Sequence, residues 1–96
     1  MARTYEGTFI LNASLDEAGL AQEQARIEEV VAREGGTVKQ WDKWGRRRLA
    51  YEIAGHTDGI YAFLTFDAEP ASIARLTQIY RLDENIVRFM CVSLGD

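Results

Sequence analysis

Apolar and polar positions alternate near the start of the chain, over residues 5–11. Alternation with a period of two is typical of a β-strand that buries one face. The odd positions of this stretch are Tyr5, Gly7, Phe9 and Leu11, and the even positions are Glu6, Thr8 and Ile10. We therefore expect a half-buried strand whose odd positions face the core.

A helix is expected next, because the apolar positions take up helical spacing. Ser14 is followed three positions later by Glu17, the spacing of a capping box, which predicts a helix that opens near Asp16. Gly35-Gly36 ends it, since glycine adopts the left-handed conformation of a helix C-terminus without steric cost. The stripe expected along one face consists of Leu20, Gln24, Ile27, Val30 and Val31.

The middle of the chain predicts two strands joined by a turn. Residues 37–53 are rich in β-branched and aromatic side chains, and Gly45 within them suggests a bulge or bend. Residues 55–59 have the composition of a turn, and residues 60–66 form the strongest strand pattern of the chain. The positions expected to continue the core at the end of the first of these strands are Leu49, Tyr51 and Ile53.

The last third of the chain predicts a second helix and a closing strand. Pro70 suits the first turn of a helix, which ends at residues 83–85 and precedes a strand at residues 86–94. Its inner face carries Ile73, Leu76 and Tyr80. The order βαββαβ is that of the ferredoxin-like split βαβ fold, a four-stranded antiparallel sheet with two helices on one face. The second face of such a sheet is uncovered, and two of its strands are edges.

Length and composition limit the class of protein. The 96 residues, 47% of them hydrophobic and 27% charged, allow one soluble domain, expected to span residues 1–96. A single cysteine excludes an internal disulfide and a multi-cysteine zinc site. The sequence contains neither a signal-peptide pattern nor an apolar run of the ~20 residues that cross a bilayer. We therefore expect a cytoplasmic protein without a membrane partner.

Charge is unevenly distributed along the chain. The net charge of −4 excludes a uniformly basic nucleic-acid-binding protein. Residues 16–34 nevertheless carry six acidic side chains against two arginines, and residues 39–48 carry five basic side chains against one aspartate. This asymmetry suggests one face for an anionic partner, although two solvated faces explain it equally well.

The polar side chains do not form a catalytic set. His56 is the only histidine and lies in the glycine-rich turn, and Cys91 has the position of a small apolar core residue. Gly35-Gly36 follows a helix, which is the wrong end for cradling phosphate. We expect no enzyme, no bound metal, no cofactor and no small-molecule substrate.

The aromatic strand offers a first link to nucleic acid. Residues 61–66, Tyr-Ala-Phe-Leu-Thr-Phe, resemble the third-strand signature of the RNA-recognition motif, whose aromatics stack on bases. The basic residue and glycine that precede the first aromatic in that motif are replaced by Gly59 and Ile60. If Phe9 of the first strand also stacked on a base, the alternation of that strand would place Glu6 in the core. Burying this carboxylate costs several kcal/mol unless it is paired. Packing of these aromatics in the core is the simpler interpretation.

The segment 44–53 offers a second link, since it reads Trp-Gly-Arg-Arg-Arg-Leu-Ala-Tyr-Glu-Ile. It closely resembles the signature of the bacterial small-subunit ribosomal protein six family. The start of the chain, Arg3-Thr4-Tyr5-Glu6, and residues 81–90 resemble the same family at matching separations. The resemblance implies a ferredoxin-like ribosomal protein without catalytic activity. It also implies binding to the central domain of small-subunit ribosomal RNA, as a heterodimer with small-subunit ribosomal protein eighteen.

The resemblance also implies where RNA would bind. The positions that match the family's RNA surface are Arg3, Arg81 and Arg88, with Arg46 as a secondary candidate. The guanidinium group of arginine is a planar fork of donors that suits phosphate oxygens and stacks on bases. Because the first and last strands flank each other in this topology, we expect Arg3 and Arg88 to be neighbours on the sheet.

The same segment is expected to contact a protein partner. It lies on an edge strand, where charged side chains also block unwanted strand pairing. Aromatic residues rimmed by arginine are typical of protein interfaces. The residues assigned mainly to the partner are Trp41, Trp44, Arg47 and Arg48.

Two classes of function remain open from the sequence. The first is a structural constituent of the small ribosomal subunit. The second is a ferredoxin-like interaction or regulatory module outside the ribosome, which either forms homodimers through its open sheet or binds single-stranded RNA as an RNA-recognition motif does.

Overall fold

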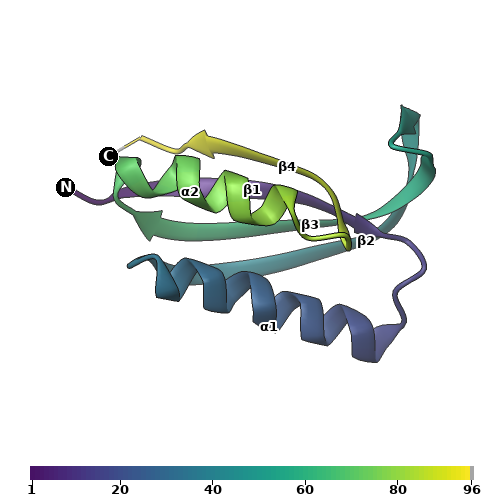
Figure 1. Cartoon of the computed structure of the whole chain (residues 1–96), viewed down its shortest axis with the longest axis horizontal. Coiled ribbons are helices and arrows are strands. Elements are labelled where there is room, and N and C mark those ends of the chain that lie inside the picture. The colour runs from purple at the N-terminus through teal and green to yellow at the C-terminus, as the bar shows by residue number, and fades with distance from the viewer. Residues whose placement is uncertain (96) are drawn as a thin grey trace.

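The computed structural model describes residues 1–95. The elements are β1 (Arg3–Asn12), α1 (Glu17–Arg33), β2 (Thr37–Ile53), β3 (His56–Ala68), α2 (Pro70–Arg81) and β4 (Ile86–Ser93). The strands form one antiparallel sheet in the order β2-β3-β1-β4, and both helices cover the same face (Figure 1). The predicted ferredoxin-like split βαβ fold is confirmed.

The core lies between the helices and the odd-numbered positions of β1, as the alternation predicts. Phe9 is fully buried and contacts Tyr80 of α2 edge to face, with ring centroids 5.1 Å apart. Ile27 and Val31 of α1 are also fully buried. Leu76 completes the inner face of α2, so the periodicity of each helix identifies its buried side correctly.

The start of α1 differs from the expected capping box. Asp16 is the N-cap residue, and its carboxylate accepts a 2.7 Å hydrogen bond from the backbone N–H of Gly19. The backbone N–H and the hydroxyl of Ser14 instead both donate to the side-chain oxygen of Asn12. Aspartate is as good an N-cap as serine, and Asp16 lies two residues closer to the helix. Asp16 rather than Ser14 therefore caps it.

The β2–β3 turn is shorter than expected. β3 begins at His56, so residues 56–59 belong to the strand and the connection is made by Ala54 and Gly55 alone. Both have positive φ, 49° and 84°, as a two-residue hairpin turn requires. Gly59, which contributed to the prediction of a longer turn, is required for close packing instead. A Cβ there would collide with the side chain of Ile10 on β1.

The long β2–β3 hairpin bends toward the β4 side of the sheet (Figure 1). Leu49 is buried as expected, but it approaches Gly59 and Ile10 on the face opposite the helices. Tyr51, also expected in the core, is 62% exposed, because it lies on the part of the hairpin that extends beyond the other strands. The hairpin thus shields Ile10, which is 4% exposed although it points away from the main core.

Two aromatics of β3 lie outside the core, contrary to the simpler interpretation. Phe66 is buried, whereas Tyr61 and Phe63 are only partly buried. Their register partners on β1 are Ile10 and Thr8, which belong to the face opposite Phe9. Tyr61 and Phe63 are at odd positions and Phe66 is at an even one. Because side chains alternate between the faces of a strand, only Phe66 faces the helices.

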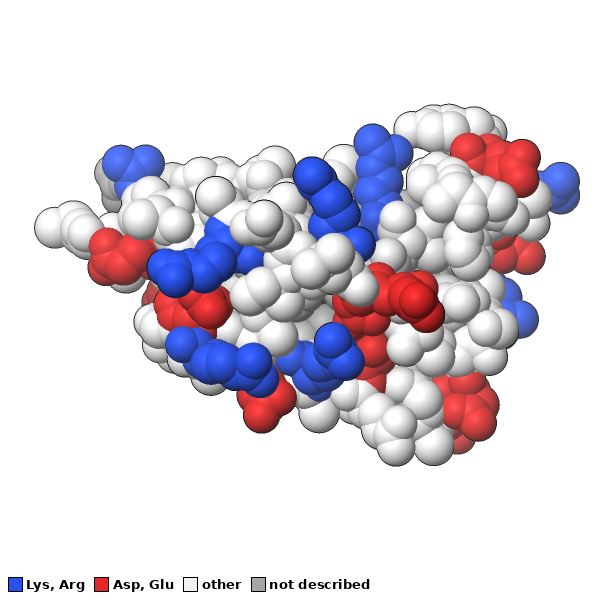
Figure 2. All heavy atoms as spheres, viewed as in Figure 1, with Lys and Arg blue, Asp and Glu red and all other residues white. Residues whose placement is uncertain are grey.

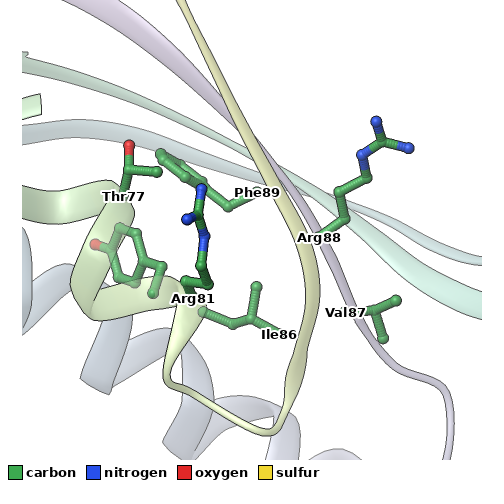
Figure 3. A pocket seen from close by; sticks show the side chains of 7 residues that line it. Thr77, Arg81, Ile86, Val87, Arg88 and Phe89 are labelled. Carbon is green, nitrogen blue, oxygen red and sulfur yellow. The ribbon is translucent and has the colours of Figure 1, made fainter. Parts of the chain in front are cut away.

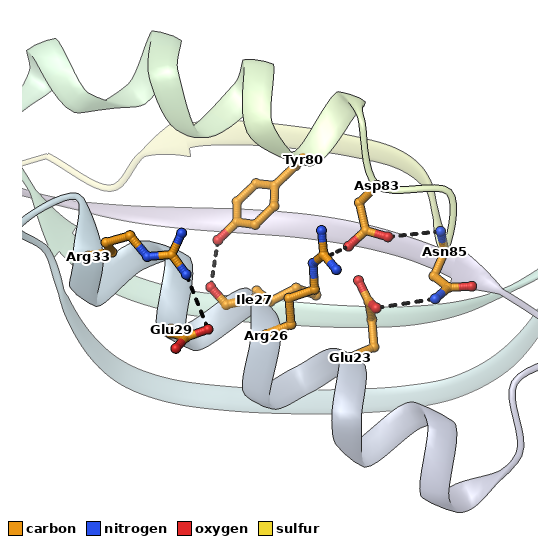
Figure 4. A network of polar contacts seen from close by, with 8 residues as sticks. All are labelled: Glu23, Arg26, Ile27, Glu29, Arg33, Tyr80, Asp83 and Asn85. Atoms are coloured by element: carbon orange, nitrogen blue, oxygen red, sulfur yellow. Dashed lines mark hydrogen bonds and ion pairs between the residues drawn. The ribbon is translucent and has the colours of Figure 1, made fainter.

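A polar network joins α1 to the end of α2 (Figure 4). Asp83 is buried, accepts the backbone N–H of Asn85 at 2.9 Å, and pairs with Arg26 at 3.3 Å. Glu23 is 4% exposed, accepts a 3.4 Å hydrogen bond from Asn85, and has one carboxyl oxygen without a hydrogen-bond partner among the described residues. Burial, reinforced by the neighbouring carboxylate of Asp83, raises the pKa of Glu23 to about 7.

Neither helix of the described chain is long and apolar enough to cross a membrane.

Candidate nucleic-acid and protein interface

The uncovered face of the sheet carries exposed apolar side chains next to arginine. Its centre, which we call the open-face patch, consists of Trp44, Phe63, Met90 and Val92. Phe63 and Met90 both pair with Thr8, from opposite sides, so the patch crosses the sheet from β2 to β4. Met90 is 47% and Val92 55% exposed, and apolar groups exposed together in this way are typical of an interaction site.

A bulge in β2 orients Trp44 toward this patch. Lys43 and Gly45 pair with consecutive residues of β3, so Trp44 is the extra residue between them. Its ring meets Phe63 edge to face at 4.8 Å between centroids and is 60% exposed. The guanidinium carbon of Arg47 lies 5.8 Å from the centre of the Trp44 ring, a cation–π distance. The bulge that Gly45 suggested is therefore present, and it places Trp44 on the open-face patch.

The second tryptophan of β2 lies on the other face. Trp41 is partly buried and contacts Phe9, with ring centroids 6.2 Å apart. It also lines an open groove of about 460 Å³ beside Leu20 of α1. The two tryptophans are thus separated by the β2 edge, and a single partner reaches both only by wrapping around that edge.

The three consecutive arginines of β2 have different surroundings. The guanidinium of Arg46 donates a 2.6 Å hydrogen bond to the backbone carbonyl of Ala13, which ties the hairpin to the loop between β1 and α1. Arg47 contacts Trp44 on the open face, and Arg48 is exposed beside Asp58 of β3. The three arginines therefore do not share one surface, as alternation along a strand requires.

Arg81 and Arg88 lie on the two sides of β4, which is an edge strand. Arg81 ends α2 and lines a cavity of about 260 Å³ together with Thr77 and Phe89. Arg88 points to the other side of the strand (Figure 3) and donates a 2.9 Å hydrogen bond to the hydroxyl of Tyr51. Both guanidinium groups are therefore accessible to a ligand that crosses the free edge of β4.

Arg3 and Arg88 are not neighbours, which corrects the expectation. β1 and β4 do pair, but their antiparallel register sets Arg88 opposite Ile10. Ile10 lies seven positions along β1 from Arg3, which is about 23 Å in an extended strand. The two arginines also have opposite parity, so they belong to opposite faces as well as opposite ends of the sheet.

The remaining reactive side chains give no sign of catalysis. Burial raises the pKa of the Cys91 thiol to about 11, which keeps it protonated and unreactive at neutral pH. Within residues 1–95, no group of three or more His, Cys, Asp and Glu residues is arranged to hold a metal ion.

The helix-covered side has the character of a solvated surface. Figure 2 shows basic and acidic side chains interspersed over it rather than gathered by sign. Several of them form ion pairs, including Arg33 with Glu29 and Arg75 with Glu34. Such a surface offers no extended positive field for a polyanion.

Three residues of the open face were not identified from the sequence. Met90 and Val92 have the parity of Arg88, and their exposure could have been inferred from that alternation once Cys91 was assigned inward. The place of Tyr51 on the open face could not have been inferred, because its contact with Arg88 depends on the bend of the hairpin. Local sequence does not specify that bend.

Comparisons with known proteins agree on one family. Residues 4–93 match the family model described as ribosomal protein S6. The chain is 44% identical over 94 residues to small ribosomal subunit protein bS6 of Bifidobacterium longum, covering 98% of this chain and 97% of the relative. It is 40% identical over 91 residues to the protein of the same name from Clostridium novyi, covering 95% and 96%. The crystal structure of 30S ribosomal protein S6 from Thermotoga maritima has the same fold, with a TM-score of 0.88 at 23% identity over 97% of this chain and 88% of that one.

Proposed function

Because the chain belongs to the ribosomal protein S6 family, we propose that it binds the central domain of small-subunit ribosomal RNA as a heterodimer with small-subunit ribosomal protein eighteen. Membership of this family makes the chain a structural, non-enzymatic protein of the small ribosomal subunit in the cytoplasm. The observation that carries this proposal is the uncovered sheet face, with an apolar patch at its centre and arginines at its margins. One surface can thereby receive a protein while its edge receives RNA.

The RNA contact is assigned first to the β4 edge. Arg81 and Arg88 are exposed on the two sides of this strand, and within residues 1–95 no other strand pairs with its outer edge. An RNA backbone that crosses the edge meets both guanidinium groups, which position it through phosphate oxygens without reading bases. Arg3 makes a separate contact at the far end of the sheet. Arg46, which already donates to Ala13, contributes less.

The protein contact is assigned to the open-face patch and the β2 edge. Trp44 is the anchor, because it is large and stays exposed although it packs against Phe63. Arg47 and Arg48 border it, and Trp41 is reached where the partner extends around the edge. Covering the patch removes exposed apolar area from water, which drives association.

Charge explains why a partner is needed. The net charge of −4 repels RNA at long range, and only a few arginines reach any one surface. A basic protein bound to the open face supplies the missing positive charge and holds the β4 edge against the RNA.

A pull-down tests both contacts separately. Tagged chain, captured from a bacterial lysate, is expected to retain protein eighteen after nuclease digestion and to retain ribosomal RNA before it. The double variant Arg81→Ala/Arg88→Ala should lose RNA and keep the protein. Arg75→Ala, an exposed arginine on the helix side paired with Glu34, is the matched control and should lose neither. Loss of protein eighteen on digestion would contradict direct pairing.

A further inference from the structure

The hairpin formed by β2 and β3 reaches across the open face to the opposite edge of the sheet. Tyr51 on β2 and Arg88 on β4 belong to the two outermost strands, yet their side chains meet in a 2.9 Å hydrogen bond. Beneath this contact, Ile10 is almost completely buried and Leu49 is 7% exposed. The bend of the hairpin is therefore supported by apolar packing as well as by the hydrogen bond.

The hydrogen bond uses only part of the donor capacity of Arg88. A guanidinium group has five N–H donors in a rigid plane, and one of the terminal nitrogens donates to the Tyr51 hydroxyl. Arg88 has no ion-pair partner among the described residues, and both side chains are exposed. The contact therefore fixes where the plane of donors lies without neutralising its charge.

We propose that Tyr51 is a positioning residue, which holds the guanidinium of Arg88 in the orientation that receives an RNA phosphate at the β4 edge. This inference rests on the RNA contact proposed above and adds a residue that touches no RNA itself. A long arginine side chain loses rotamer freedom when it binds phosphate, and a tyrosine that has already restricted it lowers this cost. The function of the hairpin bend is then to bring Tyr51 to Arg88.

Affinity and salt dependence together distinguish positioning from direct contact. The measurement is filter binding of a central-domain ribosomal RNA fragment by the heterodimer across a salt series. Arg88→Ala removes a phosphate contact, so it should lower affinity and reduce the slope of log affinity against log salt by about 0.7–0.9. Tyr51→Phe removes only a hydroxyl, so it should lower affinity by about 3- to 10-fold and leave the slope unchanged.

The double variant Tyr51→Phe/Arg88→Ala provides the decisive comparison. If Tyr51 acts through Arg88, the double variant should bind as Arg88→Ala does. Tyr61→Phe, which removes a hydroxyl from the same sheet face, is the matched control and should bind as the unaltered protein. Because Tyr51 and Arg88 are exposed, the urea midpoints should not change.

Three results would overturn the inference. An unchanged affinity of Tyr51→Phe alongside weakened binding by Arg88→Ala would refute positioning and leave the RNA contact standing. If Tyr51→Phe lowered RNA affinity by the same factor in the unaltered protein and in Arg88→Ala, the tyrosine would contact RNA directly. Unchanged binding by Arg88→Ala would refute the proposed RNA surface, and the role of Tyr51 with it.

Discussion

The hydroxyl of Tyr80 on α2 donates a 2.7 Å hydrogen bond to the backbone carbonyl of Ile27 on α1. This bond connects the two helices inside the core, 53 residues apart in sequence (Figure 4). The same tyrosine ring packs against Phe9, so one side chain joins both helices to the central strand of the sheet. The helix layer that covers the face opposite the open-face patch depends on such contacts.

Removing that hydroxyl should weaken the fold by a modest amount. Tyr80→Phe keeps the aromatic packing and loses one buried hydrogen bond, so the free energy of unfolding should fall by about 0.5–1.5 kcal/mol. Urea unfolding at neutral pH measures it. A variant as stable as the unaltered protein would show that the bond contributes nothing net.

Truncation in the helix core should cost more than truncation on the open face. Ile27→Ala removes a fully buried side chain and should cost about 2–5 kcal/mol. Arg47→Ala, exposed beside Trp44, should stay within about 0.5 kcal/mol of the unaltered protein. Equal denaturant midpoints for the two variants would refute the assignment of faces.

Stability should fall as pH rises from about 5 to 8 because of Glu23. Its pKa is raised from 4.5 to about 7 in the folded protein, chiefly by burial and then by Asp83. The folded state thus binds the proton more tightly than the unfolded state, and the resulting stabilisation is present below pH 4.5 and lost as pH passes 7. Glu23→Gln removes this titration. In urea titrations at several pH values, the stability of Glu23→Gln should therefore decline less over this range, and parallel curves would contradict the assignment.

The two tryptophans of β2 should respond differently to truncation. Trp44→Ala should leave unfolding cooperative and weaken the heterodimer by about 2 kcal/mol, because Trp44 is exposed on the patch. Trp41→Ala should lower the melting temperature, because it removes the contact with Phe9. Calorimetric titration with protein eighteen and thermal unfolding measure the two effects. Unchanged affinity of Trp44→Ala would exclude Trp44 as the anchor.

How far sequence predicts this molecule depends on the range of the interactions involved. The alternation in β1 and the stripe of α1 identify Phe9 and Ile27 correctly, because burial of one face imposes a period that local sequence records. The position of Arg88 relative to Arg3 could not be obtained in this way. It depends on the register between strands far apart in the chain, and neighbouring strands alone do not specify which residues face each other.

The same reasoning accounts for Tyr51 and Leu49. Because both residues have the same parity, the sequence predicted that both are buried. The hairpin extends past the rest of the sheet and bends, so only Leu49 packs against the sheet. The tight packing of Gly59 against Ile10, which supports the bend, is a tertiary contact. Composition alone predicted a turn there.

In the proposed complex, RNA binding is shared between this chain and a basic partner. Three arginines, Arg3, Arg81 and Arg88, would give a slope of log affinity against log salt of only about −2 to −3, too little for tight binding at physiological salt. Filter binding of central-domain ribosomal RNA, by the chain alone and by its heterodimer with protein eighteen across a salt series, measures this directly. We predict weak binding by the chain alone and tight binding by the heterodimer, with a steeper slope that Arg3→Ala/Arg88→Ala flattens by about 1–2 units. Tight, salt-insensitive binding by the chain alone would contradict the account and favour base stacking on Tyr61 and Phe63.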